Sequence, residues 1–266
     1  MTAIVLAGGR GQRLKESAIS TLATSAQRRA AARGLKVLMP VGPGHRPLID
    51  YVLARLAEAG CSDAVLVVPP DHAELAAHLS ANPPAGLAVR LAVQPVANGT
   101  ADAVAAAAPH VAAPACLVMN GDNLYPRAAL RSLLELETCG MAGFKRQSLE
   151  RDSGFTAERV AAFASVECDA GGWLTGLTEK PPVEAIAPAT FMSMNLWRMD
   201  QAMLAACRDV VRSSRGEFEL PDAVMLAVAR GTRVRVVEAS GAVLDLTTAA
   251  DVAIVSRALA GAESPA

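Results

Sequence analysis

The stretch AIVLAGGRGQRL, residues 3–14, decides the fold that this sequence predicts. Its first five residues are continuously apolar, which is typical of a strand buried on both faces of a parallel sheet. Gly8, Gly9 and Gly11 follow, and glycines here let the backbone turn tightly and let successive N–H groups form an anion site. Arg13 adds a guanidinium suited to phosphate oxygens. Taken alone, the loop is equally consistent with a glycine turn beside a solvated arginine.

Two other phosphate-binding patterns do not fit this loop. A dinucleotide fingerprint needs a third glycine where Arg13 and Leu14 stand, and an acidic residue about twenty positions later. The stretch after Gly11 is instead basic and alanine-rich, which disfavours a Rossmann-type oxidoreductase. A Walker loop would need Gly-Lys-Ser/Thr, and that sequence is absent.

Short β-branched runs alternate with Ala- and Leu-rich helical stretches through the first half of the chain. The expected strands are 3–7, 64–68, 88–93 and 115–119, with a later one at 233–238, and the expected helices are 47–59, 71–80, 100–108 and 127–136. This alternation predicts an α/β fold with a mostly parallel sheet and right-handed crossovers. Ligands bind such sheets beyond the carboxyl ends of the strands.

The pattern changes after residue 140. The strands expected there are 159–168, 173–179 and 190–198, and helices return at 199–212, 218–230 and 248–260. We expect a β-rich subregion that faces the same cleft. Residues 16–33 read as an inserted, partly basic helix. One domain is expected over residues 1–260, divided into halves 1–139 and 140–260, with residues 261–266 as a frayed tail.

Composition narrows the possible partners. The chain has 266 residues, 52% of them hydrophobic, and a net charge of −1. A protein that neutralises nucleic-acid phosphates normally carries a basic excess, so no nucleic-acid partner is expected. The five scattered cysteines form no Cys-x-x-Cys pair and are expected to be buried thiols in a reducing compartment. With neither a signal peptide nor a membrane span in the pattern, we expect a cytoplasmic protein.

Two further motifs stand where strands are expected to end. In QPVANGTADAV, residues 94–104, the Gln94 amide can read a base edge, Gly99 permits close approach, and Thr100 is expected to cap a helix. In LVMNGDNLY, residues 117–125, a buried strand leads into Asp122 at the mouth of the expected cleft. Mg²⁺ is held by one or two such carboxylates together with substrate phosphates. Each motif is also compatible with an ordinary turn.

Taken in order, these segments resemble the sugar-1-phosphate nucleotidyltransferases. The resemblance covers LAGGRGQRL, GLKVLMPVGPGHRPLIDYVL (34–53), QPVANGTADAV, the Gly121-Asp122 strand end, LTEKP (177–181), RGEFELPDAV (215–224) and VLDLTTAADVAIV (243–255). It implies the Rossmann-like three-layer sandwich of the nucleotide-diphospho-sugar transferases, with a β-rich acceptor-binding subregion. It also implies a nucleoside triphosphate (NTP) and a phosphorylated small-molecule acceptor as partners, and Mg²⁺ as cofactor.

The resemblance assigns a role to each matching residue. The implied nucleotide-binding residues are Leu6, Ala7, Gly8, Gly9, Gly11, Gln94, Gly99 and Thr100. The implied catalytic residues are Arg13, Lys36 and Lys180, and the implied metal ligands are Asp122 and Asp245. The implied acceptor-binding residues are Glu179, Lys180, Ser193, Asn195 and Ala164. Glu217 and Glu219 fit the family's late helix start, although acidic residues in a first helical turn need no further role.

Departures from the family pattern concentrate on the acceptor side. Ala164 stands where many members have Gly, and Ser193 and Asn195 stand in the positions of a sugar-binding Asn and a Gly. Gln12, Leu35 and Thr247 also replace usual residues. The sequence therefore keeps three alternatives open: a sugar-1-phosphate nucleotidyltransferase, an enzyme for a non-sugar phosphate or phosphonate acceptor, and a catalytically silent nucleotide-sugar sensor. The nucleobase, the acceptor and the oligomeric state are not fixed by the sequence.

Overall fold

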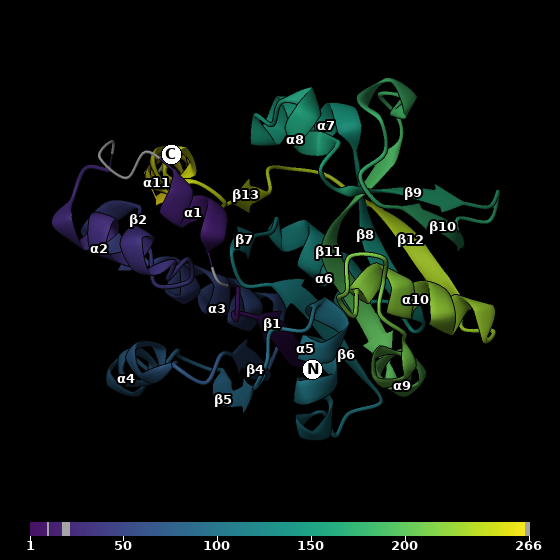
Figure 1. Cartoon of the computed structure of the whole chain (residues 1–266), viewed down its shortest axis with the longest axis horizontal. Helices are drawn as coiled ribbons and strands as arrows, with labels where there is room; N and C mark the ends of the chain where they lie inside the picture. The colour runs from purple at the N-terminus through teal and green to yellow at the C-terminus, as the bar shows by residue number, and fades with distance from the viewer. Residues whose placement is uncertain (10, 18–21, 264–266) are drawn as a thin grey trace.

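A nine-stranded mixed sheet organises the chain, which the computed structural model describes over residues 1–9, 11–17 and 22–263 (Figure 1). β1 (Thr2–Leu6) lies between two parallel neighbours, β4 (Asp63–Val68) and β6 (Ala115–Asn120), and β5 (Ala88–Val93) extends this side in parallel. The carboxyl ends of these four strands therefore meet at one edge, which is where the glycine loop begins.

The second half of the chain joins the sheet through β11 (Phe191–Asp200). β11 runs antiparallel to β6, and also to β8 (Cys139–Lys145) and β9 (Ala164–Cys168), so the sheet forks along its length. β10 (Leu174–Thr178) continues beyond β9, and β12 (Val234–Ala239) pairs in parallel with β8. The expected α/β fold is confirmed, and its central sheet is mixed, with parallel pairs in the first half and antiparallel pairs around β11.

Helices cover both faces of the sheet because its strand residues are apolar on both faces. Ile4 packs with α5 (Thr100–Ala107), α9 (Gln201–Asp209) and α10 (Leu220–Ala229) on one face. Its neighbours Ala3 and Val5 pack with α3 (Leu48–Ala59) and α6 (Arg127–Leu134) on the other. Adjacent residues of one strand thus enter different cores, which gives the three layers that the sequence predicts.

The remaining elements connect these layers or border the strand ends. They are α1 (Gln12–Glu16), α2 (Ser25–Arg33), β2 (Pro40–Val41), η2 (Pro43–His45), β3 (Arg46–Pro47), α4 (Ala73–Ala81), η3 (Ala108–His110), β7 (Asn123–Leu124), α7 (Arg146–Ser153), α8 (Ala157–Val160), η4 (Val183–Ala185), β13 (Leu244–Asp245) and α11 (Ala249–Glu263).

Three expectations about elements need correction. The insertion at 16–33 is helical at Ser25–Arg33, and its residues 18–21 lie outside the described residues. The strand expected at 159–168 is α8 followed by β9. The helix expected at 248–260 is α11, which continues to Glu263, and residues 264–266 of the expected tail lie outside the described residues.

β8 is a strand that the sequence pattern did not predict. Its sequence CGMAGFK contains two glycines, which normally weaken a strand. The structure gives a reason for Gly143, since a Cβ atom there would lie 2.9 Å from the side chain of Val236 and 3.1 Å from that of Phe191. Close packing between strands, rather than local strand propensity, therefore selects this residue.

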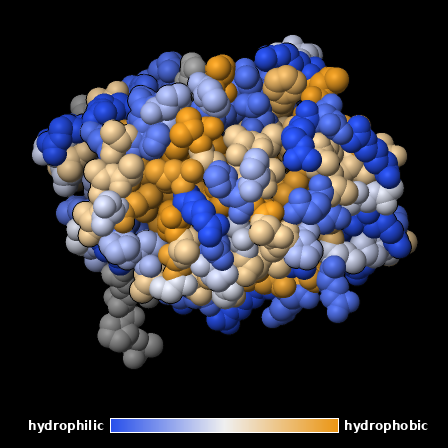
Figure 2. All heavy atoms as spheres, turned by 90° about the horizontal axis from the view of Figure 1, so that it is seen from below, coloured by the Kyte–Doolittle hydropathy of each residue, from blue (hydrophilic) through white to orange (hydrophobic). Residues whose placement is uncertain are grey.

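The molecular surface is mixed in character. Viewed from below Figure 1, hydrophobic residues gather near the middle of the face, and most of the hydrophilic residues lie around them (Figure 2). Among the described residues, no helix is long and apolar enough to cross a bilayer.

Cysteine accessibility provides a direct check of this fold. Four cysteines are buried as expected, whereas the expectation is wrong for Cys168 on β9, which is exposed. Burial raises the pKa of Cys61 to about 11 and those of Cys116, Cys139 and Cys207 to about 12. Since the thiolate is the reactive form, we expect one fast-reacting thiol with Ellman's reagent at pH 8, and five in denaturant. The Cys168→Ser variant should lose the fast phase, and two or more fast thiols in the native protein would contradict this packing.

Candidate active site

The glycine loop lies beyond the end of β1 and packs against Gly34. Gly11 has φ of +59°, and a Cβ atom there would lie 2.4 Å from the Gly34 carbonyl oxygen. Gly34 is itself a left-handed cap that ends α2. A side chain on Gly11 would therefore push the loop away from α2. A Cβ atom on Gly9, by contrast, would meet nothing within 4 Å, so its backbone stays open to a ligand.

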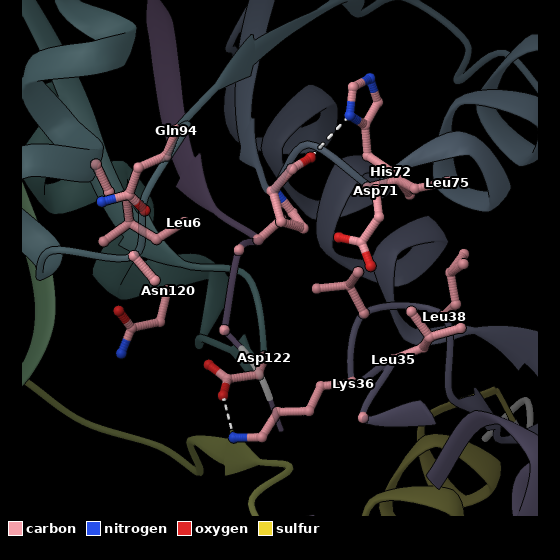
Figure 3. Close-up of a pocket in the computed structure, with 18 of the residues that line it drawn as sticks. Leu6, Leu35, Lys36, Leu38, Asp71, His72, Leu75, Gln94, Asn120 and Asp122 are labelled. Atoms are coloured by element: carbon pink, nitrogen blue, oxygen red, sulfur yellow. Dashed lines mark hydrogen bonds and ion pairs between the residues drawn. The ribbon is translucent and has the colours of Figure 1, made fainter. Parts of the chain in front are cut away.

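A cleft of about 490 Å³, called here the glycine-loop cleft, opens beside this loop (Figure 3). Among its lining residues are Leu6, Ala7, Gly8, Gly9, Leu35, Lys36, Leu75, Gln94, Gly99, Thr100, Asn120, Asp122 and Glu217. All the predicted nucleotide-binding residues except Gly11 thus border one hollow. Leu6, Leu35 and Leu75 give it apolar wall area, which suits the face of a nucleobase.

Gln94 is held in one orientation by its own loop. Its Nε2 donates to the Gly99 carbonyl at 3.0 Å and to Asp102 Oδ2 at 2.7 Å, and the side chain is 8% exposed. Both amide donors are thereby used, so Gln94 can offer a ligand only its carbonyl oxygen.

Gly99 and Thr100 contact a distant segment as well as the cleft. A Cβ atom on Gly99 would lie 2.3 Å from the carbonyl oxygen of Phe218, whose N–H donates to the Asn98 carbonyl at 2.7 Å. The expectation that Thr100 caps its own helix is wrong, because Gly99 is the cap residue of α5. The Thr100 hydroxyl instead accepts the Leu220 N–H at 3.0 Å, so it helps to cap α10.

Lys36 and Asp122 form an ion pair where β6 ends. Asp122 follows Gly121, whose N–H donates to the Leu6 carbonyl at 2.9 Å. Lys36 Nζ lies 2.8 Å from Asp122 Oδ2, and the two side chains are 16% and 25% exposed. The pair is therefore only partly screened by solvent.

Asp245 reaches Asp122 through a two-stranded ladder. β7 pairs with β13 so that Asn123 faces Asp245, and the Leu246 N–H donates to the Asp122 carbonyl at 3.0 Å. The Asn123 amide, with its nitrogen facing the carboxylates, donates to Asp122 Oδ1 at 3.3 Å and Asp245 Oδ1 at 3.2 Å. Burial, and then the nearby Asp122 charge, raise the pKa of Asp245. Two carboxylates, which repel each other when both are charged, thus contact the same amide, and a bound cation would relieve this repulsion.

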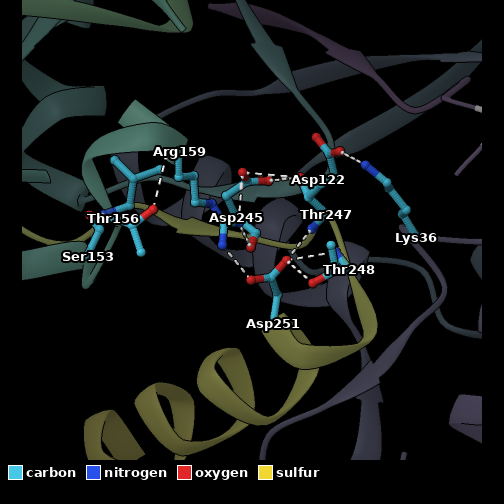
Figure 4. A network of polar contacts seen from close by, with 10 residues as sticks. Lys36, Asp122, Ser153, Thr156, Arg159, Asp245, Thr247, Thr248 and Asp251 are labelled. Atoms are coloured by element: carbon cyan, nitrogen blue, oxygen red, sulfur yellow. Dashed lines mark hydrogen bonds and ion pairs between the residues drawn. The ribbon is translucent and has the colours of Figure 1, made fainter. Parts of the chain in front are cut away.

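Arg159 and Asp251 complete this network, and the sequence analysis missed both (Figure 4). Arg159, on α8, donates to Asp245 Oδ2 at 3.1 Å and to Asp251 Oδ1 at 2.5 Å. Asp251 Oδ2 accepts the N–H groups of Thr247 and Thr248 at 3.0 and 2.7 Å. Thr248 and Asp251 have the spacing of a helix-capping pair, which could have drawn attention to Asp251. Arg159 carried no comparable signal.

These residues border a second cleft of about 550 Å³, called here the carboxylate cleft. Its lining includes Gly11, Arg13, Asn123, Arg159, Phe163, Met194, Asn195, Asp245, Thr247 and Thr248. Gly9, Lys36, Asn120 and Asp122 line both clefts. The Lys36–Asp122 pair therefore lies where the two clefts meet, and Arg13 and Asp245 line the carboxylate cleft but not the glycine-loop cleft.

The predicted acceptor residues are only partly gathered here. Ser193 on β11 pairs in register with Ala164 on β9, and both are 4% exposed. Asn195 lies at an irregularity of β11 with φ of +56°, and lines the carboxylate cleft. Glu179 and Lys180 line neither of these two clefts. A carboxylate oxygen of Glu179 lies 3.9 Å from a guanidinium nitrogen of Arg215, and Lys180 has φ of +46°.

Comparisons with known proteins find relatives over most of this chain. The chain is 30% identical over 255 residues to the glucose-1-phosphate thymidylyltransferase of an Actinoplanes species, covering 94% of this chain and 75% of that protein. It is 29% identical to the bifunctional protein GlmU of Sorangium cellulosum, covering 89% of this chain and 47% of the relative.

Solved structures share the fold at lower identity. The inositol-1-phosphate CTP transferase of T. maritima superposes with a TM-score of 0.72 at 21% identity, covering 100% of this chain and 97% of that one. A UDP-glucose pyrophosphorylase solved with UDP-glucose gives a TM-score of 0.74 at 15% identity, covering 98% of this chain and 99% of that one. The family model described as nucleotidyl transferase matches residues 2–259. With these matches and this cleft geometry, the chain belongs to the nucleotidyl transferase family.

Proposed function

We propose that this chain transfers a nucleotidyl group from an NTP to a sugar 1-phosphate, giving a nucleotide-linked sugar and pyrophosphate. The observation that carries the proposal is the Lys36–Asp122 pair at the junction of the two clefts. A nucleoside in the glycine-loop cleft and an acceptor in the carboxylate cleft would bring their phosphates together at this junction. Two of the relatives are named glucose-1-phosphate thymidylyltransferases, and this supports a sugar 1-phosphate as the substrate class.

The chemistry requires charge neutralisation more than proton transfer. A phosphate oxygen of the acceptor attacks the α-phosphorus of the NTP, the bond from that phosphorus to its bridging oxygen breaks, and pyrophosphate leaves with the electron pair. The attacking oxygen is already anionic at neutral pH, so no general base is needed. Catalysis then consists of positioning and of cations held where charge accumulates.

Each cationic side chain has a place in this scheme. Lys36 would neutralise the phosphates at the junction, and Arg13 would bind the departing pyrophosphate beside the glycine loop. The family resemblance assigns Lys180 to the acceptor phosphate and Glu179 to an acceptor hydroxyl. Because both residues line neither cleft in this structure, these roles require the two side chains to approach the carboxylate cleft when the acceptor binds. Ser193, Asn195 and Ala164 would form the acceptor wall, where Ala164 replaces a smaller residue of the family pattern.

The donor set also fits Mg²⁺. Among the described residues, no group of three or more His, Cys, Asp or Glu side chains is placed to hold a metal. Mg²⁺ does not need such a group, because it usually takes one or two carboxylates together with substrate phosphates. Asp122 and Asp245, bridged by Asn123, would hold the ion, which when bound withdraws charge from a phosphoryl oxygen.

A substrate panel tests this proposal. We expect pyrophosphate release with one of ATP, GTP, CTP, UTP or dTTP only when an acceptor phosphate and Mg²⁺ are both present. The acceptor panel should contain sugar 1-phosphates, inositol 1-phosphate, phosphocholine and a phosphonate, because the acceptor wall departs from the family pattern. Omitting the acceptor, or adding a chelator, serves as the control. Nucleotide binding without pyrophosphate release for any pair would instead favour a catalytically silent sensor.

A further inference from the structure

Arg159 makes a forked contact that joins two segments far apart in the sequence. One guanidinium nitrogen donates to Asp251, and the other donates to both the Oδ2 and the main-chain carbonyl of Asp245, each at 3.1 Å. The guanidinium also lies over the Phe155 ring, 4.5 Å from its centroid. A planar group fixed on two edges and one face has little freedom to reorient.

The charges around Arg159 explain why a cation stands there. The side chains of Asp245 and Asp251 are 8% and 4% exposed, whereas that of Arg159 is 25% exposed. Among the described residues, Asp122 has Lys36 as its ion-pair partner, and Asp245 and Asp251 have only Arg159. Three carboxylates thus share two cations, and the local excess of negative charge can accept one more positive ion.

The fork also fixes the direction of the Asp245 carboxylate. Its Oδ2 is turned toward Arg159, while its Oδ1 accepts from the Asn123 amide at 3.2 Å. The Thr247 hydroxyl lies between the two oxygens, 3.0 Å from Oδ1 and 3.2 Å from Oδ2. Asn123 is the residue that also contacts Asp122. Arg159 therefore takes one oxygen of Asp245 and leaves the other on the side of Asp122.

A second contact ties the same two segments together. The Ser153 hydroxyl, at the end of α7, accepts the Val243 N–H at 2.9 Å in a buried position. Ala162 and Phe163, which follow the cap residue of α8, line the carboxylate cleft. The loop that carries Asp245 is thus fastened to the 153–163 segment, part of which lines the carboxylate cleft. Figure 4 shows Ser153 and Arg159 of this segment beside Asp245.

We propose that Arg159 is a positioning residue: it holds the Asp245 carboxylate toward Asp122 and couples this carboxylate pair to the 159–163 segment that lines the carboxylate cleft. The inference rests on the proposed function for its catalytic consequence, but its first consequence is affinity for a divalent cation. Residues that orient metal-binding carboxylates typically change metal affinity or activity by about 10–100-fold when replaced.

The experiment measures Mn²⁺ binding to the full chain without substrates, by the electron paramagnetic resonance signal of free Mn²⁺. We expect Arg159→Met to weaken Mn²⁺ binding by about tenfold or more. Arg159→Lys keeps the charge but not the fork, so it should bind Mn²⁺ more weakly than the wild type as well. The matched control is Arg146→Met, because Arg146 is 21% exposed and pairs with Glu150 away from the carboxylates.

Two further readouts separate positioning from general destabilisation. In the activity assay, Arg159→Met should raise the Mg²⁺ concentration needed for half-maximal rate by the same factor as the Mn²⁺ dissociation constant. A variant that is only less stable would lose rate equally at all Mg²⁺ concentrations. Unchanged or tighter Mn²⁺ binding in folded Arg159→Met and Arg159→Lys, or no Mn²⁺ binding by the wild type, would overturn the inference; tighter binding in Arg159→Met alone would mean that the charge of Arg159 matters more than its fork. Weakened Mn²⁺ binding in a chain whose wild type releases no pyrophosphate would support the positioning role and reject the proposed function.

Discussion

Replacing Lys36 with methionine is expected to lower kcat/KM by at least about a hundredfold. Removal of one well-placed donor to a charged transition state typically costs about 3 kcal/mol. Lys36 is also the ion-pair partner of Asp122, so its loss leaves a partly buried carboxylate at the point where the phosphates would meet. Both effects oppose the approach of two anions, and methionine preserves the aliphatic stem so that packing changes little. Pyrophosphate release at varied NTP and acceptor concentrations measures the loss.

The control for this variant is Lys145→Met. Lys145 forms an ion pair of the same length, 2.8 Å, with Glu238, away from both clefts. Exposed pairs of this kind contribute at most about 1 kcal/mol to stability, so near-normal activity is expected. A Lys36→Met enzyme within threefold of the wild type would remove the charge-neutralising role.

Asp122→Asn extends the same test to the other member of the pair. We expect a loss of similar size, because the amide cannot hold a divalent cation as a carboxylate does. If the two side chains act together, the double variant should lose much less than the product of the two single losses. Independent roles would instead give multiplied losses.

The first half of the fold could be predicted from sequence because its strands are buried on both faces. Runs such as AVLVV at 64–68 have few alternatives to a parallel strand, and their helices follow at short distances. β8 was not predicted because Gly143 is required by the nearby side chains of Val236 and Phe191, which are distant in sequence. Local patterns report local preferences, and a strand selected by its neighbours carries a weak local pattern.

The candidate site divides in the same way. Residues within short motifs, such as Gly9, Lys36 and Asp122, are found from spacing, and the structure brings them to one junction. Arg159 lies 86 residues before Asp245 in a segment with no motif, so only the folded chain shows its fork. For Thr100 the local pattern misled: it predicted a cap for the helix that follows, whereas the Thr100 hydroxyl accepts the N–H of Leu220, 120 residues away.

Gly99→Ala is expected to weaken NTP binding at least about tenfold and to destabilise the fold by about 2 kcal/mol or more. Gly99 has φ of +122°, which L side chains rarely adopt, and strain of this kind costs about 1–3 kcal/mol. The added Cβ would also lie 2.3 Å from the Phe218 carbonyl oxygen, so the loop or the 217–220 segment must move. That movement would disturb the Gly99 carbonyl that orients Gln94, and with it the wall of the glycine-loop cleft.

Gly60→Ala separates strain from collision in this prediction. Gly60 has a similar φ of +107°, but a Cβ atom there would meet nothing within 4 Å. We expect Gly60→Ala to lower Tm by a few degrees through strain, at about 2–4 °C per kcal/mol for a chain of this size, and to leave KM for NTP unchanged. Thermal unfolding and nucleotide titration of both variants measure the two effects. Because only the collision at Gly99 reaches Phe218 and Gln94, equal changes in KM for the two variants would mean that this contact does not shape the nucleotide site.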